Sequence, residues 1–507
     1  MSDSILEVRD LTVTLRHRGA SGRRLLDAID FSVAAGEFVG LSGPSGSGKS
    51  TLALALLGLI DDGKQASVSG SIELNGGQLL GQPAAQRDGR CIAGIFQDPV
   101  AALNPVRTVG SQLREVAQRH LPRGSRQSQV QSALSSLQLP DALLQRYPFQ
   151  LSGGQCQRIA ICMAMVISPA VLIADEPTSA LDTLSQQAVM QALDVLRQQG
   201  SAIVLISHDR RLIGRWCDRS MVMDAGRLTV NQAVSEGELP GGPKYRKPAA
   251  SDGNSPVLRC HGVVARHRAN GSSKGNRGSA ALAGITFELS AGETLAVVGP
   301  SGCGKSTLAR VLVGLHPASG GRIQWGGALE RPSRRQRARM AQLVFQNPAL
   351  SLSPTKTVMK LIAEPMLLHT TVSRSQVKDE VAKWLARVGL STELFDRYPH
   401  QLSGGQQQRI AIARAICLEP RVLIADEPVA ALDDDTRQAA LRLLAQIQVQ
   451  HRMALILISH DLSSVTKVSD RVLVMDAGRV VELGETAGVL AAPSHPLTQA
   501  LLAADCG

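Results

Sequence analysis

The chain has 507 residues, of which 44% are hydrophobic and 3% are aromatic, and its formal net charge is +11. This length and apolar content predict two or more globular domains, each with its own core. The low aromatic content argues against a base-stacking surface for single-stranded nucleic acid. The positive charge alone does not distinguish a nucleic-acid partner from an anionic membrane surface.

The N-terminus, MSDSILEVRD, has neither the basic flank nor the apolar region of a signal peptide. The longest apolar stretch, residues 159–174, is interrupted by Ser168 and Pro169 and is shorter than the roughly 20 residues that span a bilayer. The eight cysteines are scattered, without a C-x-x-C pair or a metal-ligand spacing, which predicts reduced thiols. We therefore expect a cytoplasmic chain without a transmembrane helix.

The first predicted strand and helix along the chain enclose a phosphate-binding loop. FVGLSG, residues 38–43, is a short apolar strand, and STLALALLGL, residues 50–59, has helical composition. GPSGSGKST between them fits G-x-x-x-x-G-K-[ST], in which backbone N–H groups surround the phosphates, lysine reaches the terminal phosphates and the next hydroxyl ligates Mg²⁺. The predicted phosphate-binding residues are Gly43, Ser45, Gly46, Gly48, Lys49, Ser50 and Thr51.

Residues 100–165 are predicted to be a mostly helical insertion, which ends in RYPFQLSGGQCQRIAI, residues 146–161. Here two adjacent glycines stand at the head of an apolar helix, where backbone can approach an anion closely. The candidate binding residues at this helix head are Ser152, Gly153, Gly154 and Gln155.

Two apolar strands follow the insertion, and polar side chains stand at their ends. VLIAD, residues 171–175, ends at Asp175, which is a candidate to hold Mg²⁺, and Glu176 is placed to polarise an attacking water. LISHD contains His208, which could hydrogen-bond a γ-phosphate. The alternatives are that the two carboxylates merely cap a strand-to-turn junction and that the histidine is structural.

The same blocks recur in the same order, so the chain is a tandem duplication. GPSGSGKST, FQDP, VLIADEP, LISHD and MDAGR start at 43, 96, 171, 205 and 223, and their second copies start at 299, 345, 422, 457 and 475. Alternating strands and helices predict α/β domains with mostly parallel sheets. A segment rich in Pro, Gly and Ser separates the copies. We predict domains at 1–232 and 257–507, joined by a linker at 233–256.

The second copy supplies a second set of candidate residues. They are Gly299, Ser301, Gly302, Gly304, Lys305, Ser306 and Thr307 in the loop, Ser403, Gly404, Gly405 and Gln406 at the helix head, and Asp426, Glu427 and His460 at strand ends.

The order of these motifs resembles the nucleotide-binding domain of ABC transporters over nearly the whole chain, in two copies. The resemblance rests on the phosphate-binding loop, the glutamine of FQDP and FQNP, LSGGQ, Asp-Glu, SALD and SHD. It implies two ABC-type P-loop NTPase domains that bind ATP and Mg²⁺ and pair within the chain, so that each LSGGQ faces the loop of the other half. The implied catalytic residues are Glu176, His208, Glu427 and His460. The implied metal ligands are Ser50, Gln97, Asp175, Ser306, Gln346 and Asp426.

FQDPVAALNP, FQNPALSLSP, RYP ahead of LSGGQ and the tail HPLTQALL are similar to the peptide/nickel importer ATPases, which usually work as two separate subunits. This resemblance implies that two ATPase subunits are fused in one chain and power an importer of peptide, nickel or metal chelate. The sequence does not reveal which of these is the cargo. It implies two integral-membrane permease subunits, a substrate-binding protein reached through them and a peripheral position on the cytoplasmic face of the inner (plasma) membrane.

The chain also departs from that family. It has no C-terminal cysteine cluster, so no iron–sulfur cluster is implied, and its second SALD motif reads AALD at 430–433. Residues 9–30 and 257–286 contain no Phe, Tyr or Trp to hold adenine, which leaves His17 in the first half and Arg266 or His267 in the second as candidates.

The alternative function is that of a soluble tandem ABC ATPase acting on the ribosome or on nucleic acid. The positive charge gives this function some support. The short Pro/Gly linker and the absence of zinc-binding cysteine pairs argue against it, and no nucleic-acid partner is expected.

Overall fold

The computed structural model describes residues 4–17, 20–44, 46–60, 66–82, 92–96, 102–178, 181–231, 256–266, 280–326, 332–428, 434–460, 462 and 467–506. The chain divides into two compact units, residues 1–181 with 185–240 and residues 182–184 with 241–507. Almost all of the predicted linker, 233–256, lies outside the described residues. Within the described ranges, no helix combines the length and the apolar character that a bilayer crossing requires.

A six-stranded sheet forms the centre of the first half, in the order β10-β9-β3-β8-β7-β6. Its neighbours are parallel except for the hairpin of β9 and β10. Every residue of β7 and β8 is buried, because these apolar strands are covered on both faces. The fold class predicted from the sequence is confirmed. The strands are β3 (Phe38–Ser42), β6 (Ile92–Ile95), β7 (Val171–Asp175), β8 (Ala202–Ile206), β9 (Arg219–Asp224) and β10 (Arg227–Asn231).

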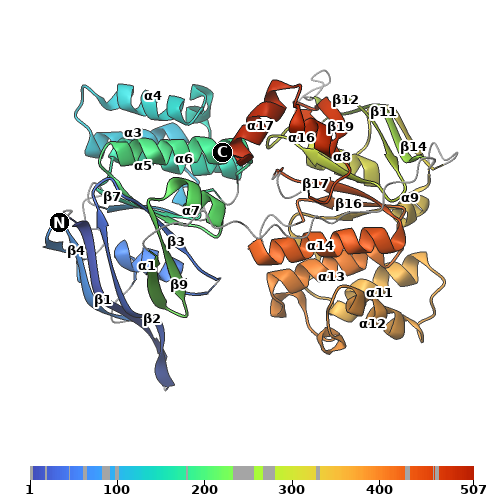
Figure 1. The fold of residues 1–507 in the computed structure, drawn as a ribbon, viewed down its shortest axis with the longest axis horizontal. Helices are drawn as coiled ribbons and strands as arrows, with labels where there is room; N and C mark the ends of the chain where they lie inside the picture. Colours follow the sequence, from blue (N-terminus) through green and yellow to red (C-terminus); the bar gives the residue numbers. More distant parts are fainter. Residues whose placement is uncertain are drawn as a thin grey trace. The chain divides into compact units, whose positions relative to one another are not determined.

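The alternation of side chains along β7 divides the first half into two cores. Leu172 and Ala174 pack with the helices on one face of the sheet, and Val171 and Ile173 pack with a helix and an antiparallel sheet on the other. Figure 1 shows the helices of the first face. The helices of the first face are α3 (Val109–His120), α4 (Arg126–Ser136), α5 (Gly153–Ile167), α6 (Thr183–Gln198) and α7 (Arg210–Trp216).

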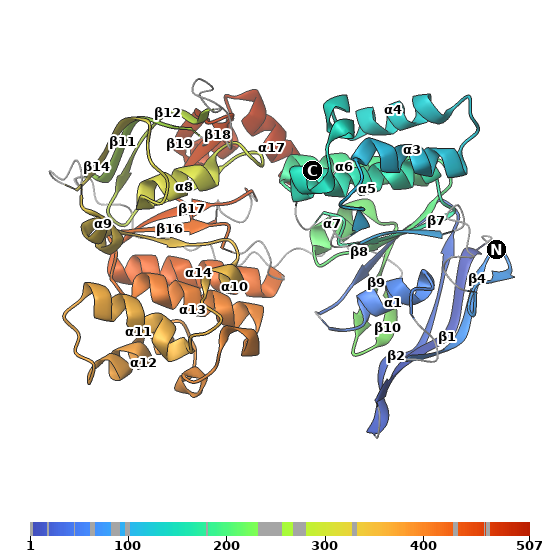
Figure 2. The same ribbon diagram turned by 180° about the vertical axis from the view of Figure 1, so that it is seen from behind.

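The second face is covered by helix α1 (Lys49–Leu56) and by the antiparallel sheet β2-β1-β4-β5, as Figure 2 shows from behind. The strands of this sheet are β1 (Ser4–His17), β2 (Ala20–Ala34), β4 (Ala66–Leu74) and β5 (Gly77–Gln78). The sequence analysis did not predict this sheet.

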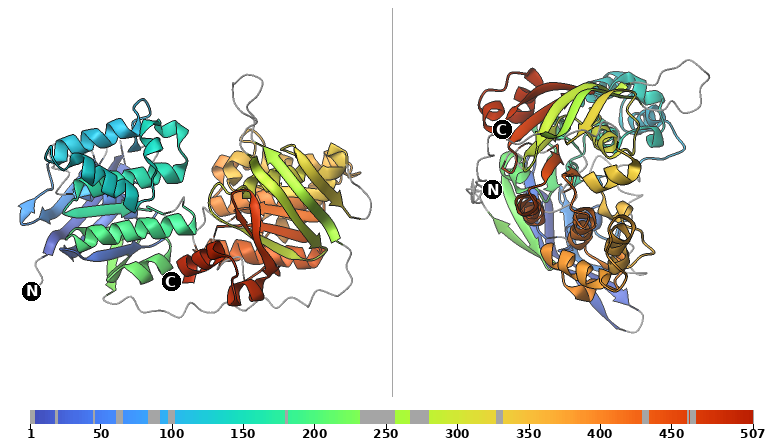
Figure 3. Two further views of the ribbon diagram at one scale, coloured as in Figure 1. Left: turned by 90° about the horizontal axis from the view of Figure 1, so that it is seen from above. Right: turned by 90° about the vertical axis from the view of Figure 1, so that its right-hand side faces the viewer.

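The second half repeats the plan around the sheet β15-β16-β17-β13-β18-β19, of which only β18 and β19 pair antiparallel (Figure 3). Its strands are β13 (Thr294–Val298), β15 (Ala341–Val344), β16 (Val422–Asp426), β17 (Ala454–Ile458), β18 (Arg471–Asp476) and β19 (Arg479–Glu485). The antiparallel sheet β12-β11-β14 contains β11 (Pro256–Arg266), β12 (Ala280–Ser290) and β14 (Gly320–Trp325).

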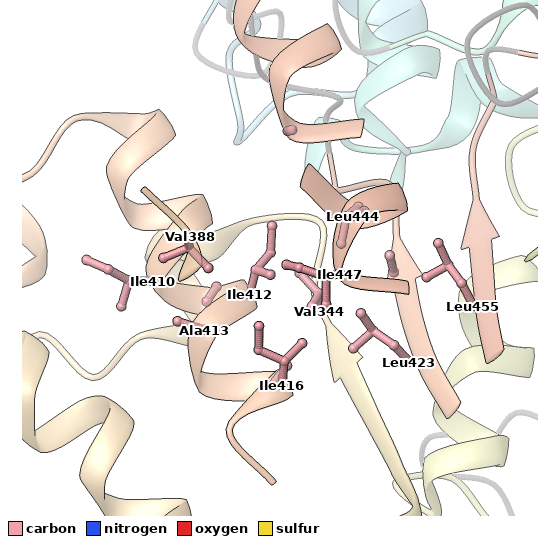
Figure 4. Packing of buried hydrophobic residues seen from close by; sticks show 14 of the residues in the cluster. Val344, Val388, Ile410, Ile412, Ala413, Ile416, Leu423, Leu444, Ile447 and Leu455 are labelled. Carbon is pink, nitrogen blue, oxygen red and sulfur yellow. The ribbon is translucent and has the colours of Figure 1, made fainter. Parts of the chain in front are cut away.

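Helix α8 packs with the antiparallel sheet, and a layer of longer helices covers the opposite face. In Figure 4, residues of α13 and α14 meet residues of three strands, namely Ile412, Ile416, Leu444, Ile447, Val344, Leu423 and Leu455. The helices are α8 (Lys305–Val313), α9 (Arg334–Met340), α10 (Pro348–Ser351), α11 (Val358–His369), α12 (Val377–Arg387), α13 (Gly404–Ile416) and α14 (Asp434–His451).

The C-terminal tail follows β19 and forms α16 (Thr486–Ala491) and α17 (Pro496–Cys506). Hydrogen bonds to one carboxylate of β19 hold the segment between these two helices. Glu482 accepts hydrogen bonds from the backbone N–H groups of Ser494 and His495, at 2.8 and 3.2 Å, and from the Ser494 hydroxyl at 2.9 Å. Although burial opposes the effect, these bonds lower the pKa of Glu482 to about 2.

Candidate functional site

The two phosphate-binding loops have the same strained backbone, which only glycine adopts at low cost. Gly43 and Gly299 both have a φ of 149°, and a Cβ atom on them would lie 2.1 Å and 2.2 Å from the carbonyl oxygens of Met223 and Met475. Gly48 precedes α1 in the left-handed conformation, with a φ of 112°. The loops are therefore fixed against the neighbouring strand of their own half.

The lysine of each loop lies inside the loop itself. Lys49 Nζ donates to the carbonyl oxygens of Gly43 and Pro44 at 2.8 and 2.9 Å, and Lys305 makes the equivalent two contacts at 2.7 and 2.9 Å. Burial lowers the pKa of Lys49. An incoming phosphate would give each ammonium a charged acceptor in place of two neutral ones.

A buried aspartate and a serine hydroxyl meet beside each lysine. Asp175 and Asp426 end β7 and β16, and burial raises the pKa of both carboxyls. Ser306 Oγ donates to Asp426 Oδ1 at 3.1 Å, and Ser50 makes the corresponding bond to Asp175. Carboxylate and hydroxyl oxygens are ligands that suit Mg²⁺, so this donor set fits that ion.

The glutamate after each aspartate has an unusual backbone. Glu176 and Glu427 have φ values of 51° and 46°, and their N–H groups donate to the carbonyls of Ile206 and Ile458 at 3.0 Å. Non-glycine residues seldom adopt the left-handed region, and such strain is concentrated at functional sites. Because the left-handed backbone recurs at the glutamate of both halves, we infer that the position of this side chain matters.

In the first half, Glu176 is held by the strand-end histidine. The backbone N–H of His208 donates to Glu176 Oε1 at 3.0 Å, and His208 Nε2 lies 3.4 Å from the same oxygen. Burial, followed by the charge of Asp175, raises the pKa of Glu176 to about 7.

In the second half, a glutamine and a histidine lie beside the corresponding glutamate. Gln346 Nε2 donates to Glu427 Oε2 at 2.7 Å, and His460 Nδ1 lies 3.5 Å from that oxygen. Burial alone would raise the pKa of Glu427, but the hydrogen bond and charge of His460 lower it. The pKa values of the two carboxyls are therefore shifted in opposite directions.

The LSGGQ helices begin with a reciprocal pair of hydrogen bonds. Ser152 Oγ accepts from the Gln155 N–H at 3.2 Å, and Gln155 Oε1 accepts from the Ser152 N–H at 3.0 Å. Ser403 and Gln406 repeat both bonds at 3.3 and 3.0 Å. This is a capping box, a pattern that S-x-x-Q encodes and that the sequence analysis missed.

The first glycine inside each capping box, Gly153 or Gly404, is not required by the fold. A Cβ atom on Gly153 or on Gly404 would meet no atom within 4 Å, and neither residue has a positive φ. On Gly154, a Cβ atom would lie 2.9 Å from Leu181 Cδ2. The helix head thus presents bare backbone N–H groups on an open face, as an anion site requires.

The structure brings loop, aspartate, glutamate and histidine together at the carboxyl ends of the parallel strands in each half, where α/β folds place ligands. Thr51 and Thr307 lie in the first turns of α1 and α8. Gly46 and Gly302, each with a φ of 80°, have open space around them, and Ser301 lies in its loop.

Some predicted residues lie outside the described part of the chain, namely Ser45, Gln97, His267 and the AALD segment 430–433. His17 ends β1, and Arg266 ends β11 with its side chain exposed. The sequence analysis also assigned no role to Asp209, which caps α7 by accepting from the Arg211 N–H at 2.9 Å.

The family described as ABC transporter matches residues 26–179 and 282–430. Glutathione import ATP-binding protein GsiA of Pectobacterium atrosepticum is 35% identical, over 99% of this chain and 89% of its own. The protein of that name from Escherichia coli K12 is 37% identical, over 94% and 85%. A solved structure, cbiO1 from Clostridium perfringens, part of the ABC transporter complex cbiONQ, is 30% identical over 46% of this chain and 91% of its own, with a TM-score of 0.41.

Proposed function

The chain belongs to the ABC transporter family, and we propose that it is the ATP-hydrolysing subunit of a membrane importer for small peptides or metal chelates. The observation that carries this proposal is that each half holds a loop lysine, a strand-end aspartate, a glutamate with left-handed backbone and a histidine beside it. Relatives named for import of glutathione, a tripeptide, support a small peptide as cargo.

In the proposed reaction, the loop lysine binds the terminal phosphates of ATP, and Ser50 with Asp175, or Ser306 with Asp426, holds Mg²⁺. When bound, this ion neutralises charge on the β- and γ-phosphates. Glu176 or Glu427 orients and deprotonates the attacking water, and the adjacent histidine donates a hydrogen bond toward the γ-phosphate.

Each LSGGQ completes the ATP site of the opposite half in this proposal. The support is the N-terminus of the LSGGQ helix in each half. Its backbone N–H groups suit an anion, and a Cβ atom on Gly153 or Gly404 would meet no atom within 4 Å. Glu427→Gln should trap ATP in the second site, because binding survives while water activation is lost. Adding Ser152→Arg should abolish trapping there, whereas Ser403→Arg should act less directly. Loss of trapping with Ser403→Arg alone would assign each LSGGQ to its own half.

The partners in this proposal are two integral-membrane permease subunits and, through them, a substrate-binding protein, with the chain on the cytoplasmic face of the plasma membrane. The test is co-purification from detergent-solubilised membranes of the native organism. Permease subunits should be retained after moderate salt, which weakens purely electrostatic attraction to lipid. Complete release by salt, with no integral-membrane protein co-purifying, would count against the importer.

A further inference from the structure

A half-buried arginine joins the LSGGQ helix of the second half to the segment that follows Gln346. Arg414, on α13, donates from Nη1 to the carbonyl oxygen of Ser351 at 2.7 Å. Ser351 is the last residue of the four-residue helix α10. A charged donor in a poorly hydrated position makes a strong hydrogen bond, and burial of this guanidinium lowers the pKa of Arg414.

The other end of α10 leads to the candidate catalytic carboxylate. Asn347 caps α10 by accepting from the Leu350 N–H at 3.3 Å, and the residue before it, Gln346, donates to Glu427 at 2.7 Å. A continuous path of hydrogen bonds and one short helix therefore connects Glu427 to α13. Helix α13 begins at the capping box of Ser403.

The residue that makes this connection on α13 is replaced in the first half. Its LSGGQ helix carries Met163 where the second half has Arg414, and a thioether has no N–H to donate. Instead, Gln112 of α3 donates to the carbonyls of Asn104 and Arg107 at 3.0 and 3.1 Å. Asn104 and Arg107 are thus hydrogen-bonded to α3. The second half has Leu361 where the first has Gln112.

We propose that Arg414 is a positioning residue that transmits the state of Gln346 and Glu427 to the LSGGQ motif of α13, in the second half only. The inference rests on the proposed function, in which α13 completes the ATP site of the first half. Nucleotide that enters the second site breaks the hydrogen bond between Gln346 and Glu427 and shifts α10, and Arg414 passes this shift to α13. Occupancy of the second site then sets the ATP affinity of the first.

The experiment is a double-mutant cycle on the full chain. Lys305→Ala empties the second site, and ATP affinity of the first site is measured by photo-crosslinking, with the halves separated at a protease sequence placed in 233–256. Lys305→Ala should weaken the first site within the roughly 5- to 150-fold range of allosteric couplings. The coupling factor is the ratio of first-site ATP affinities without and with Lys305→Ala. Arg414→Met should reduce this factor by about threefold or more. Arg414→Lys, which keeps a hydrogen-bond donor, should restore part of it.

The matched control is Arg409→Met. Arg409 lies on the same helix and donates to the Val388 carbonyl at 3.1 Å, away from α10, so its loss should leave the factor unchanged. An unchanged coupling factor in Arg414→Met, or an equal reduction of it in Arg409→Met, would overturn the inference.

Ser403→Arg distinguishes the Arg414 inference from the proposed pairing of each LSGGQ with the opposite half. If it weakens the first site while Arg414→Met changes nothing, only the Arg414 inference fails. If it weakens the second site instead, the proposed pairing of the halves fails and the inference fails with it.

Discussion

Replacement of Gly404 by alanine should stabilise the protein and impair its reaction. A Cβ atom there meets no atom within 4 Å, and the backbone lies outside the region that favours glycine. Glycine-to-alanine changes at compatible positions stabilise by about 0.4–1 kcal/mol, chiefly by restricting the unfolded chain. In a unit of this size, the melting temperature should rise by roughly 1–4 °C.

The opposite effect on function follows from the open face of the helix head. The added methyl group lies beside N–H groups that must approach a phosphate, and loss of one hydrogen bond to a charged group costs about 1.5–3 kcal/mol. ATP binding at the site that α13 completes in the proposed function should therefore weaken by roughly 10- to 150-fold. Gly153→Ala should behave in the same way in the first half.

The assay combines calorimetric unfolding without nucleotide and steady-state ATP hydrolysis over a range of ATP concentrations. Gly488→Ala is the matched control, because Gly488 in α16 also has open space around its Cβ position and no positive φ. It should raise the melting temperature and leave hydrolysis unchanged. A lower melting temperature for Gly404→Ala would show that the glycine serves the fold. If Gly404→Ala raised the melting temperature and left hydrolysis unchanged, the idea that backbone N–H groups at this helix head approach a phosphate would be refuted.

Three further predictions concern the glutamates, the adenine contact and the tail. Glu176→Gln and Glu427→Gln should each slow hydrolysis at its own site by roughly 10²- to 10⁴-fold, as loss of a general base does, and an unaffected rate at that site would mark it as structural. ATP and GTP should be hydrolysed at comparable rates, because residues 9–30 and 257–286 contain no Phe, Tyr or Trp to hold adenine; a strong ATP preference that survives alanine at His17, Arg266 and His267 would contradict this. Glu482→Ala should make the C-terminal tail more sensitive to a protease, since three hydrogen bonds are lost; equal cleavage of the variant and the parent chain would show that other contacts hold it.

The parallel sheets and the phosphate-binding loops could be predicted because their signals are local. A run such as VLIAD is short, apolar and followed by polar residues, and the loop pattern occupies nine consecutive positions. The antiparallel sheets were missed because irregularities obscure their alternation. In β1, Leu6 and Val8 are buried and then Leu11 and Val13, and the shift occurs at Asp10, which has a φ of 48°.

The candidate site was predicted as a set of residues but not as a geometry. The pair Asp-Glu does not reveal that Glu176 and Glu427 adopt left-handed backbone, because the hydrogen bonds from their N–H groups are to carbonyls of a neighbouring strand. Likewise, the contact of Gln346 with Glu427 joins two strand ends that are 81 residues apart in the chain. Such contacts depend on tertiary structure, which no local pattern encodes.

The opposite pKa shifts of Glu176 and Glu427 affect how any kinetic measurement on this protein is understood. Both carboxylates belong to one polypeptide, so every molecule contains one of each in fixed proportion and cannot exchange a half with another molecule. If both halves hydrolyse ATP, a single Michaelis curve is then the sum of two curves with different constants, and apparent kcat and KM describe neither. Only chains disabled in one half at a time would resolve the two components.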